Sequence, residues 1–91
     1  MSHTLFITND FPPRPGGIQT FVYELVRQFP SSDVTVLSST WAGAQQFDVE
    51  HDFQVVRAKT QVLLPTPQTL ALARKIIVAK KVKTVIFGAS A

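Results

Sequence analysis

The sequence predicts an α/β domain in which helices flank a mostly parallel β-sheet. Short β-rich runs alternate with amphipathic helical patterns along the 91 residues, and this order favours parallel strands joined by crossover helices. The run at residues 84–87 is continuously apolar, as is typical of a strand inside a parallel sheet. Hydrophobic residues form 45% of the chain, which suits a globular core. A chain of this length forms one domain at most.

The N-terminal elements are a strand, a stiff loop and a helix. Residues 4–8 are rich in strand-forming side chains and end at the turn-forming pair Asn9-Asp10. The three prolines within residues 11–15 favour an extended, rigid segment. Over residues 18–29 the apolar positions recur at helical spacing, which predicts a helix with one buried stripe.

The remaining elements follow from the same local signals. Clusters of valine, leucine and isoleucine predict strands, and Thr66 or Pro67 begins a helix. In chain order we expect a strand at about 33–39, a loop at 40–51, a strand at 53–58, a connector at 63–67, a helix at about 68–81 and a strand at 84–87. Ligands of open α/β sheets bind beyond the carboxyl ends of the strands. Gly16-Gly17 and the segment 88–90 both fall at that edge.

Charge is divided unevenly between the two halves of the chain. Residues 1–52 contain two basic and six acidic residues, a net charge of −4, whereas residues 53–91 contain seven basic residues and no acidic one, a net charge of +7. A basic half favours an anionic membrane surface, a nucleic acid or a phosphorylated ligand as partner. The alternative is a solvated helix face. We expect no nucleic acid, because the aromatic residues are not interleaved with the cations as a stacking platform requires.

Composition also bounds the chemistry and the location. The chain contains no cysteine, which excludes a disulfide framework and a thiolate metal site. No charged-then-apolar leader precedes the first strand pattern, and the apolar runs are far shorter than the roughly 20 residues needed to cross a bilayer. We therefore expect a cytoplasmic location. His3 and His51, at the N-terminus and in a polar loop, are expected to be surface residues.

The pair Gly16-Gly17 precedes the predicted first helix. One glycine would permit a positive φ in a tight turn, and the absence of side chains would let a ligand approach the backbone. The free N–H groups of the first helical turn would then face an anionic ligand. The pattern is neither a dinucleotide-binding fingerprint nor a P-loop. A plain turn that joins strand to helix is the alternative.

The segment around these glycines resembles a known family. Residues 8–19, Thr-Asn-Asp-Phe-Pro-Pro-Arg-Pro-Gly-Gly-Ile-Gln, are similar to the opening of the family-four retaining glycosyltransferases of GT-B fold. The nearest resemblance is to the actinobacterial GDP-mannose-dependent mannosyltransferases that extend phosphatidylinositol mannosides. Further matching segments are Val55-Val56-Arg57, Leu63-Leu64-Pro65 and Val85-Ile86-Phe87-Gly88-Ala89-Ser90-Ala91.

This resemblance implies a fold and a set of site residues. Residues 1–91 would form an incomplete, acceptor-side Rossmann-like N-terminal domain, truncated after the fourth strand, without the C-terminal nucleotide-sugar domain. Gly16 and Gly17 would pack their backbone against the donor diphosphate. For the other loop residues two roles stay open, acceptor contact or loop support. These residues are Asn9, Asp10, Arg14, Gln19 and Thr20. For Asn9 and Asp10 we prefer loop support through Asx-type bonds, and for Arg14 simple solvation.

The resemblance also implies an activity and its partners. The family transfers a sugar with retention from a nucleotide-sugar donor, here GDP-mannose, to a lipid-linked acceptor such as a phosphatidylinositol mannoside. The catalytic residues of the family lie beyond residue 91, so the chain alone is expected to be inactive, and neither a cofactor nor a metal is expected. The oligomeric state stays open.

The predicted helix at 68–81 adds a second candidate surface. It combines an apolar face (Leu70, Ala73, Ile76 and Ile77) with four cations (Arg74, Lys75, Lys80 and Lys81). Basic amphipathic helices bind anionic membranes, which would place the protein peripherally on the inner face of the plasma membrane. The alternative is a helix packed on the sheet with a solvated basic side.

Two functions therefore remain. The first is part of a membrane-associated mannosyltransferase, and the second is a free-standing α/β module that binds phosphate or anionic lipid without catalysis.

Overall fold

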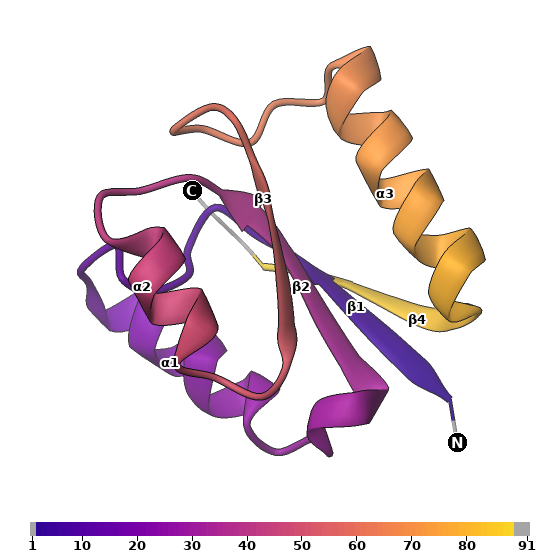
Figure 1. Ribbon diagram of the computed structural model, residues 1–91, viewed down its shortest axis with the longest axis horizontal. Coiled ribbons are helices and arrows are strands. Elements are labelled where there is room, and N and C mark those ends of the chain that lie inside the picture. The colour runs from indigo at the N-terminus through magenta and orange to yellow at the C-terminus, as the bar shows by residue number, and fades with distance from the viewer. Residues whose placement is uncertain (1, 89–91) are drawn as a thin grey trace.

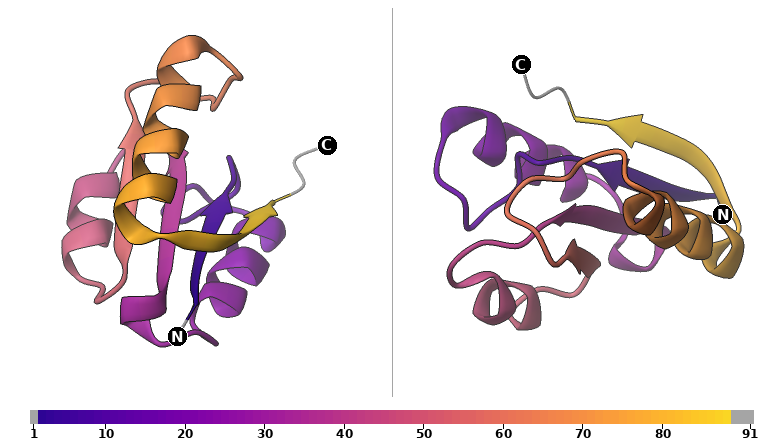
Figure 2. Two further views of the ribbon diagram at one scale, coloured as in Figure 1. Left: turned by 90° about the vertical axis from the view of Figure 1, so that its right-hand side faces the viewer. Right: turned by 90° about the horizontal axis from the view of Figure 1, so that it is seen from above.

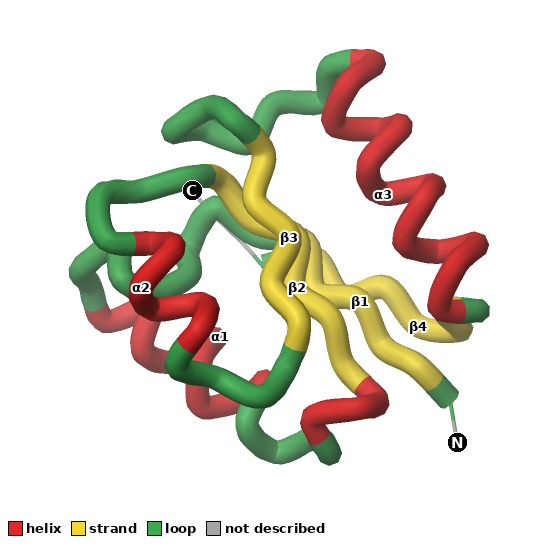
Figure 3. The backbone as a smooth tube through the Cα atoms, viewed as in Figure 1, coloured by secondary structure: helices red, strands yellow, loops and turns green. Residues whose placement is uncertain are grey.

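A computed structural model describes residues 2–88 and contains one four-stranded, fully parallel sheet. Its strands are β1 (His3–Ile7), β2 (Val34–Ser39), β3 (Gln54–Ala58) and β4 (Val82–Phe87), in the spatial order β3-β2-β1-β4. The helices are α1 (Gly17–Val26), α2 (Ala44–Val49) and α3 (Pro67–Lys80), with a short 3₁₀ turn at Ser31–Asp33. The predicted α/β class, a parallel sheet with flanking helices, is confirmed (Figures 1 and 3).

The connections explain how the helices are distributed over the two faces. The crossovers through α1 and α2 add β2 and then β3 on one side of β1, and both helices lie on one face of the sheet (Figure 1). The crossover through α3 runs back across the sheet, so α3 covers the opposite face and β4 pairs with the free side of β1. A constant right-handed crossover requires this change of face when the direction reverses. β4 is left as an outer strand (Figure 2).

Each face of the sheet carries its own apolar cluster, because successive side chains of a strand point to opposite faces. On the α1 face, Phe6 and Val36 pack with Val22 and Val26 of α1. On the α3 face, Leu5 and Leu37 pack with Ile76 of α3. All six residues of β2 are buried, as expected for an inner strand covered on both sides.

The longest helix, α3, has a common capping arrangement at each end. The Thr66 hydroxyl accepts a hydrogen bond from the Thr69 backbone N–H at 3.2 Å, and Pro67 takes the first helical position. At the other end Lys81 adopts a left-handed conformation with φ of 52°. The predicted start of this helix at Thr66 or Pro67 is confirmed.

Two expectations about the chain path are wrong. The segment predicted as a loop at 40–51 contains α2, whose Phe47 packs on the aromatic rings of Phe11 and Tyr23. The proline segment at 11–15 turns instead of running extended, and its Pro12-Pro13 peptide bond is cis. Proline fixes φ but leaves ψ free, so three prolines do not by themselves require an extended path.

The predicted first helix also differs in length and burial. α1 ends at Val26 rather than at 29, and hydrogen bonds of 3.1 Å from Gln28 to Leu25 and from Phe29 to Val26 form a tighter final turn. Only one side of the apolar stripe is buried, because the helix meets the sheet along a single line. Ile18, Phe21 and Leu25 are exposed.

Candidate functional site

The candidate site lies where the strands end, at the carboxyl edge of the sheet. The loop from β1 to α1 is held there by Thr8, whose hydroxyl accepts a hydrogen bond from the Asp10 N–H at 2.8 Å. The turn bond expected from Asn9 or Asp10 therefore comes from Thr8. Asn9 instead accepts a hydrogen bond through Oδ1 from the Leu63 N–H, which ties this loop to the one before α3.

Gly16 and Gly17 occupy the N-terminus of α1 and differ in what they tolerate. Gly16 has φ of 145°, in the region that favours glycine, and a Cβ placed there would overlap Gln19 Oε1. At Gly17 an added Cβ would meet nothing within 4 Å. Thus the backbone conformation requires Gly16, whereas Gly17 leaves open space in front of the helix.

The first N–H groups of α1 are free of protein partners within residues 2–88. No side chain caps the helix, and the first internal bond runs from the Thr20 N–H to the Gly16 carbonyl at 3.2 Å. The Thr20 hydroxyl donates to the same carbonyl at 3.1 Å. The N–H groups of residues 17–19 therefore carry the partial positive charge of the helix end without a counter-charge from the described part of the chain.

Asp10 and Gln19 form a buried polar pair beneath this helix end. Gln19 Nε2 donates to Asp10 Oδ1 at 3.2 Å, and the two residues are only 8% and 9% exposed, so Gln19 is not the solvated side chain that its position suggests. Asp10 Oδ2 is buried and has no hydrogen-bond partner among residues 2–88. A buried carboxylate oxygen without a partner is unfavourable.

Arg14 and Trp41 join the β1–α1 loop to the end of β2. The Arg14 guanidinium lies over the Trp41 ring, 4.9 Å from its centre, and the residue is half-buried. The expectation that Arg14 is simply solvated is wrong, because the indole ring stabilises its cation.

Sequence reasoning missed Arg57 as the central connector of this edge. Its guanidinium donates to both Asp48 oxygens at 3.1 and 2.8 Å, to the Ser39 carbonyl at 3.0 Å and to the Pro12 carbonyl at 2.8 Å. The Arg57 and Asp48 side chains are 11% and 19% exposed. One signal was available: Arg57 is the only cation within the predicted third strand.

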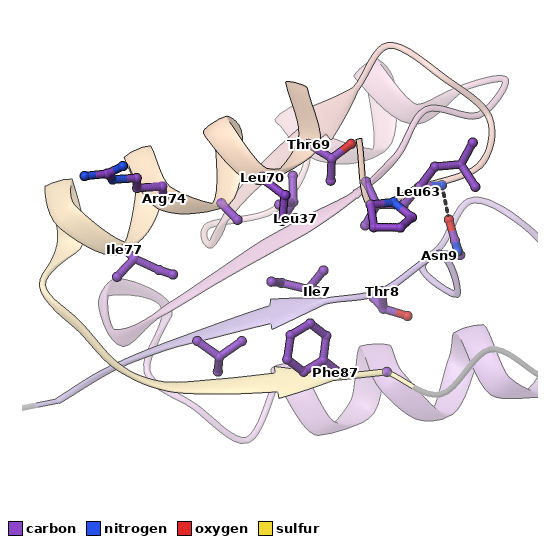
Figure 4. Close-up of a pocket in the computed structure, with 15 residues that line it drawn as sticks. Ile7, Thr8, Asn9, Leu37, Leu63, Thr69, Leu70, Arg74, Ile77 and Phe87 are labelled. Atoms are coloured by element: carbon purple, nitrogen blue, oxygen red, sulfur yellow. Dashed lines mark hydrogen bonds between the residues drawn. The ribbon is translucent and has the colours of Figure 1, made fainter. Parts of the chain in front are cut away.

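An apolar groove of about 610 Å³ lies between α3 and the sheet (Figure 4). Thr8 and Asn9 stand at its end nearest the candidate site, and Arg74 lies on α3 at the other end (Figure 4). Its walls are apolar side chains of the sheet and of α3, among them Ile7, Leu37, Leu70, Ile77 and Phe87.

Three of the four predicted membrane cations lie on α3, on the opposite face of the sheet from α1, and the fourth, Lys81, is the C-cap residue that follows it. Arg74, Lys75, Lys80 and Lys81 are exposed and have no ion-pair partner within the described part of the chain. Ile76 is buried against the sheet, whereas Leu70 is 60% exposed. Most of the apolar face therefore packs on the sheet, and membrane contact stays a prediction. No helix within residues 2–88 combines the length and apolar character needed to span a bilayer.

The two histidines have structural partners, contrary to the expectation of plain surface residues. His3 Nε2 lies 2.8 Å from the Thr35 hydroxyl. His51 lies 2.9 Å through Nε2 from the Tyr23 hydroxyl, and its Nδ1 donates to the Phe47 carbonyl at 2.6 Å. Both therefore fasten elements of the fold, away from Gly16 and Gly17.

Comparison with known proteins supports the resemblance predicted from the loop. The chain is 40% identical over 97 residues to a GDP-mannose-dependent alpha-(1-6)-phosphatidylinositol monomannoside mannosyltransferase of Mycobacterium tuberculosis strain H37Rv. That match covers 100% of this chain and 25% of the relative. The protein of the same description from Mycolicibacterium smegmatis is 40% identical over 94 residues, covering 96% of this chain and 24% of the relative.

A third relative is described as a GDP-mannose-dependent monoacylated alpha-(1-6)-phosphatidylinositol monomannoside mannosyltransferase of Corynebacterium glutamicum. It is 38% identical over 90 residues, covering 97% of this chain and 24% of the relative. No protein-family model matches the chain. The predicted resemblance is confirmed along essentially the whole chain, which spans about a quarter of the length of these curated relatives.

Proposed function

We propose that the chain is the acceptor-side part of a retaining mannosyltransferase that moves mannose from GDP-mannose to a phosphatidylinositol mannoside or a similar lipid. The proposed activity rests on the similarity of the chain to mannosyltransferases of that description. The observation that carries the site is the set of N–H groups at residues 17–19, which have no partner within the described chain and lie behind the open space at Gly17.

In this proposal the donor diphosphate rests on the N-terminus of α1. Negative charge grows on the leaving diphosphate during glycosyl transfer, and donors already aimed at that position lower the barrier without reorganisation. Phosphate oxygens need backbone N–H groups within about 3 Å, and the absence of a side chain at Gly17 permits that approach. Gly16 would form the turn that orients the N-terminus of α1 toward the diphosphate.

The polar side chains beside the helix end would serve the acceptor. Asp10 Oδ2 has no partner among residues 2–88 and is suited to accept a hydrogen bond from a sugar or inositol hydroxyl. Gln19 would orient the Asp10 carboxylate through their 3.2 Å hydrogen bond. Asn9, Arg14 and Thr20 would act as loop support, through Leu63, Trp41 and the Gly16 carbonyl.

The 91 residues alone are proposed to be inactive and to form an incomplete Rossmann-like domain. The proposed site supplies contacts to a diphosphate and to hydroxyl groups, but the side chains of residues 2–88 around it include no set that would recognise a base. Titration of the 91-residue chain with GDP and with GDP-mannose should therefore show weak binding without base selectivity. Tight, guanine-selective binding would contradict this assignment.

A specific observation favours the second candidate, a module that binds anionic lipid without catalysis. The four exposed cations of α3 and its C-cap have no acidic partner within residues 2–88, and each basic residue near an anionic surface contributes about 1 kcal/mol to membrane binding. This surface is also compatible with a peripheral enzyme on the inner face of the plasma membrane, so it does not exclude the first proposal.

Domain replacement separates the two candidates. The matched 97 residues of the M. tuberculosis relative would be exchanged for this chain, and transfer of labelled mannose from GDP-mannose to a phosphatidylinositol mannoside would be measured. An active chimera that loses activity on Gly17→Val supports the mannosyltransferase. A folded chimera without transfer, together with vesicle binding by the 91-residue chain, would support the binding module instead.

A further inference from the structure

The proline segment at residues 11–15 leads from β1 to the glycine pair and has few backbone donors of its own. Pro12, Pro13 and Pro15 have no N–H to donate. Within residues 2–88, a single hydrogen bond joins the backbone of this segment to a residue outside it: Arg57 Nη2 donates to the Pro12 carbonyl at 2.8 Å. The position of the segment therefore depends on a side chain from β3.

Arg57 is itself held in a fixed orientation. Its Nε and Nη2 donate to the two oxygens of Asp48 on α2, at 3.1 and 2.8 Å, and its Nη1 donates to the Ser39 carbonyl at the end of β2, at 3.0 Å. A two-pronged bond to a carboxylate fixes the plane of the guanidinium as well as its place. The N–H group that reaches Pro12 therefore has a defined direction.

The rest of the segment packs against the same part of the structure. Phe11 is fully buried, and its ring meets that of Phe47 on α2 with 5.8 Å between the ring centres. The Arg57 Cζ atom lies 5.8 Å from the centre of the Phe11 ring. Pro13 faces the start of α2, since a Cβ placed at Gly43 would lie 3.9 Å from Pro13 Cγ. Thus α2 and β3 form the support on which this segment rests.

The glycine pair follows directly, in a part of the chain that has little support of its own. Residues 15–18 are exposed, and α1 packs on the sheet only further along, through Val22 and Val26. The direction of the N–H groups at residues 17–19 therefore depends on where the proline segment brings the chain. Binding groups must be held within about 0.5 Å of the productive geometry, and a misplacement of about 1 Å can cost about 100-fold in rate.

We propose that Arg57, fixed by Asp48, is a positioning residue for the diphosphate site. It holds the Pro12 carbonyl so that the N–H groups of residues 17–19 stay where the diphosphate binds. Four of the five guanidinium N–H groups are already used within the protein, so Arg57 acts through the loop and not on the ligand. This inference rests on the proposed function, which assigns the end of α1 to the diphosphate. It adds that losing Arg57 lowers ligand affinity in molecules that remain folded.

Two variants disturb the positioning and leave the glycine pair intact. Arg57→Lys keeps the charge, but an ammonium group cannot hold the Asp48 carboxylate and the Pro12 carbonyl in one plane. Asp48→Asn keeps Arg57 and weakens its anchor. The control is Ile76→Ala, which removes a buried side chain on the opposite face of the sheet and lowers stability without touching this network. All variants are compared at a temperature at which circular dichroism shows them folded.

The first measurement needs no ligand. In the isotope-labelled 91-residue chain, Arg57→Lys should move the backbone amide resonances of Arg14, Gly16 and Gly17 and increase their fast motion in heteronuclear relaxation. Ile76→Ala should leave these three resonances in place. Resonances that stay unmoved in both network variants would overturn the positioning role, whatever the ligand does.

The second measurement is pyrophosphate affinity, read from the amides of residues 17–19. Arg57→Lys should weaken binding by about tenfold, the loss of roughly one hydrogen bond to a charged group, with a smaller loss in Asp48→Asn and none in Ile76→Ala. An equal loss in Ile76→Ala would show an effect of stability alone and would overturn the inference. If Arg57→Lys does not fold, Asp48→Asn decides.

The wild-type titration separates this inference from the proposed function. Pyrophosphate that does not move the amides of residues 17–19 in the unaltered chain would contradict the diphosphate site itself. Binding in the unaltered chain that persists at the same affinity in Arg57→Lys and Asp48→Asn would overturn only the positioning role of Arg57.

Discussion

Valine substitution at the two adjacent glycines should have opposite effects on folding and on ligand binding. At Gly16, valine must adopt φ of 145° and its Cβ overlaps Gln19 Oε1. Backbone strain of this kind costs about 1–3 kcal/mol and overpacking costs about 1–3 kcal/mol. Gly16→Val should therefore lower the free energy of unfolding by about 2–6 kcal/mol, a large part of the roughly 5–14 kcal/mol expected for 91 residues.

Gly17→Val should leave the stability nearly unchanged. No atom lies within 4 Å of an added Cβ, and valine has a higher helix propensity than glycine by roughly 0.4 kcal/mol. Urea denaturation of both variants is the assay. With a slope of about 1 kcal/mol/M, the midpoint should shift by several molar for Gly16→Val and by less than about 0.5 M for Gly17→Val.

The same Gly17→Val variant should block the ligand. Its side chain occupies the space that the diphosphate needs, and hydrogen bonds to a charged group contribute about 1.5–3 kcal/mol each. Loss of two of them should reduce mannose transfer by the domain-replacement chimera at least about 100-fold. Unchanged transfer at unchanged stability would refute the proposed role and leave Gly16-Gly17 as a simple turn.

Three further predictions concern residues around the site and on α3. Arg57→Met leaves Asp48 and the Pro12 and Ser39 carbonyls without their donor. Urea denaturation should therefore show a free energy of unfolding that is lower by about 2–4 kcal/mol, on the scale of a broken buried ion pair. A decrease below about 0.5 kcal/mol would show that the network is dispensable. Gly88→Ala places a Cβ 2.6 Å from Thr8 Cβ and should lower the free energy of unfolding by about 1–3 kcal/mol. Gly17→Ala should leave that free energy unchanged in the same assay. Equal stability of the two variants would contradict the packing of β4 on β1. Replacing Arg74, Lys75 and Lys80 with glutamine should reduce partitioning onto phosphatidylinositol vesicles by about 100-fold at low salt, at about 1 kcal/mol per charge. Unchanged binding in a vesicle flotation assay would contradict membrane contact through these residues.

Local sequence signals predicted most of the elements but not how completely each helix is buried. The strand at residues 34–39 and the cap at Thr66 depend on neighbouring residues, and both agree with the structure. The helical spacing at 18–29 was correct in period, but Phe21 is exposed because only one side of α1 meets the sheet. Burial depends on where the sheet lies, and periodicity alone does not contain that information.

The missed features depend on contacts between distant residues. α2 has six residues and no long apolar period, and Phe47 is held by Phe11 and Tyr23 from other parts of the chain. Arg57 joins partners at positions 12, 39 and 48, which no local window contains. The glycine loop was recognisable because its signal, Gly16-Gly17 between a strand and a helix, is contiguous in the sequence.

The most direct test of the proposed site is a pyrophosphate titration of the isotope-labelled 91-residue chain, followed through its backbone amide resonances. We expect saturable shifts that are largest at Gly17, Ile18 and Gln19, and the same titration of Gly17→Val should move them little. Shifts confined to the lysines of α3, with the α1 amides unmoved, would contradict the claim that this helix end receives the diphosphate.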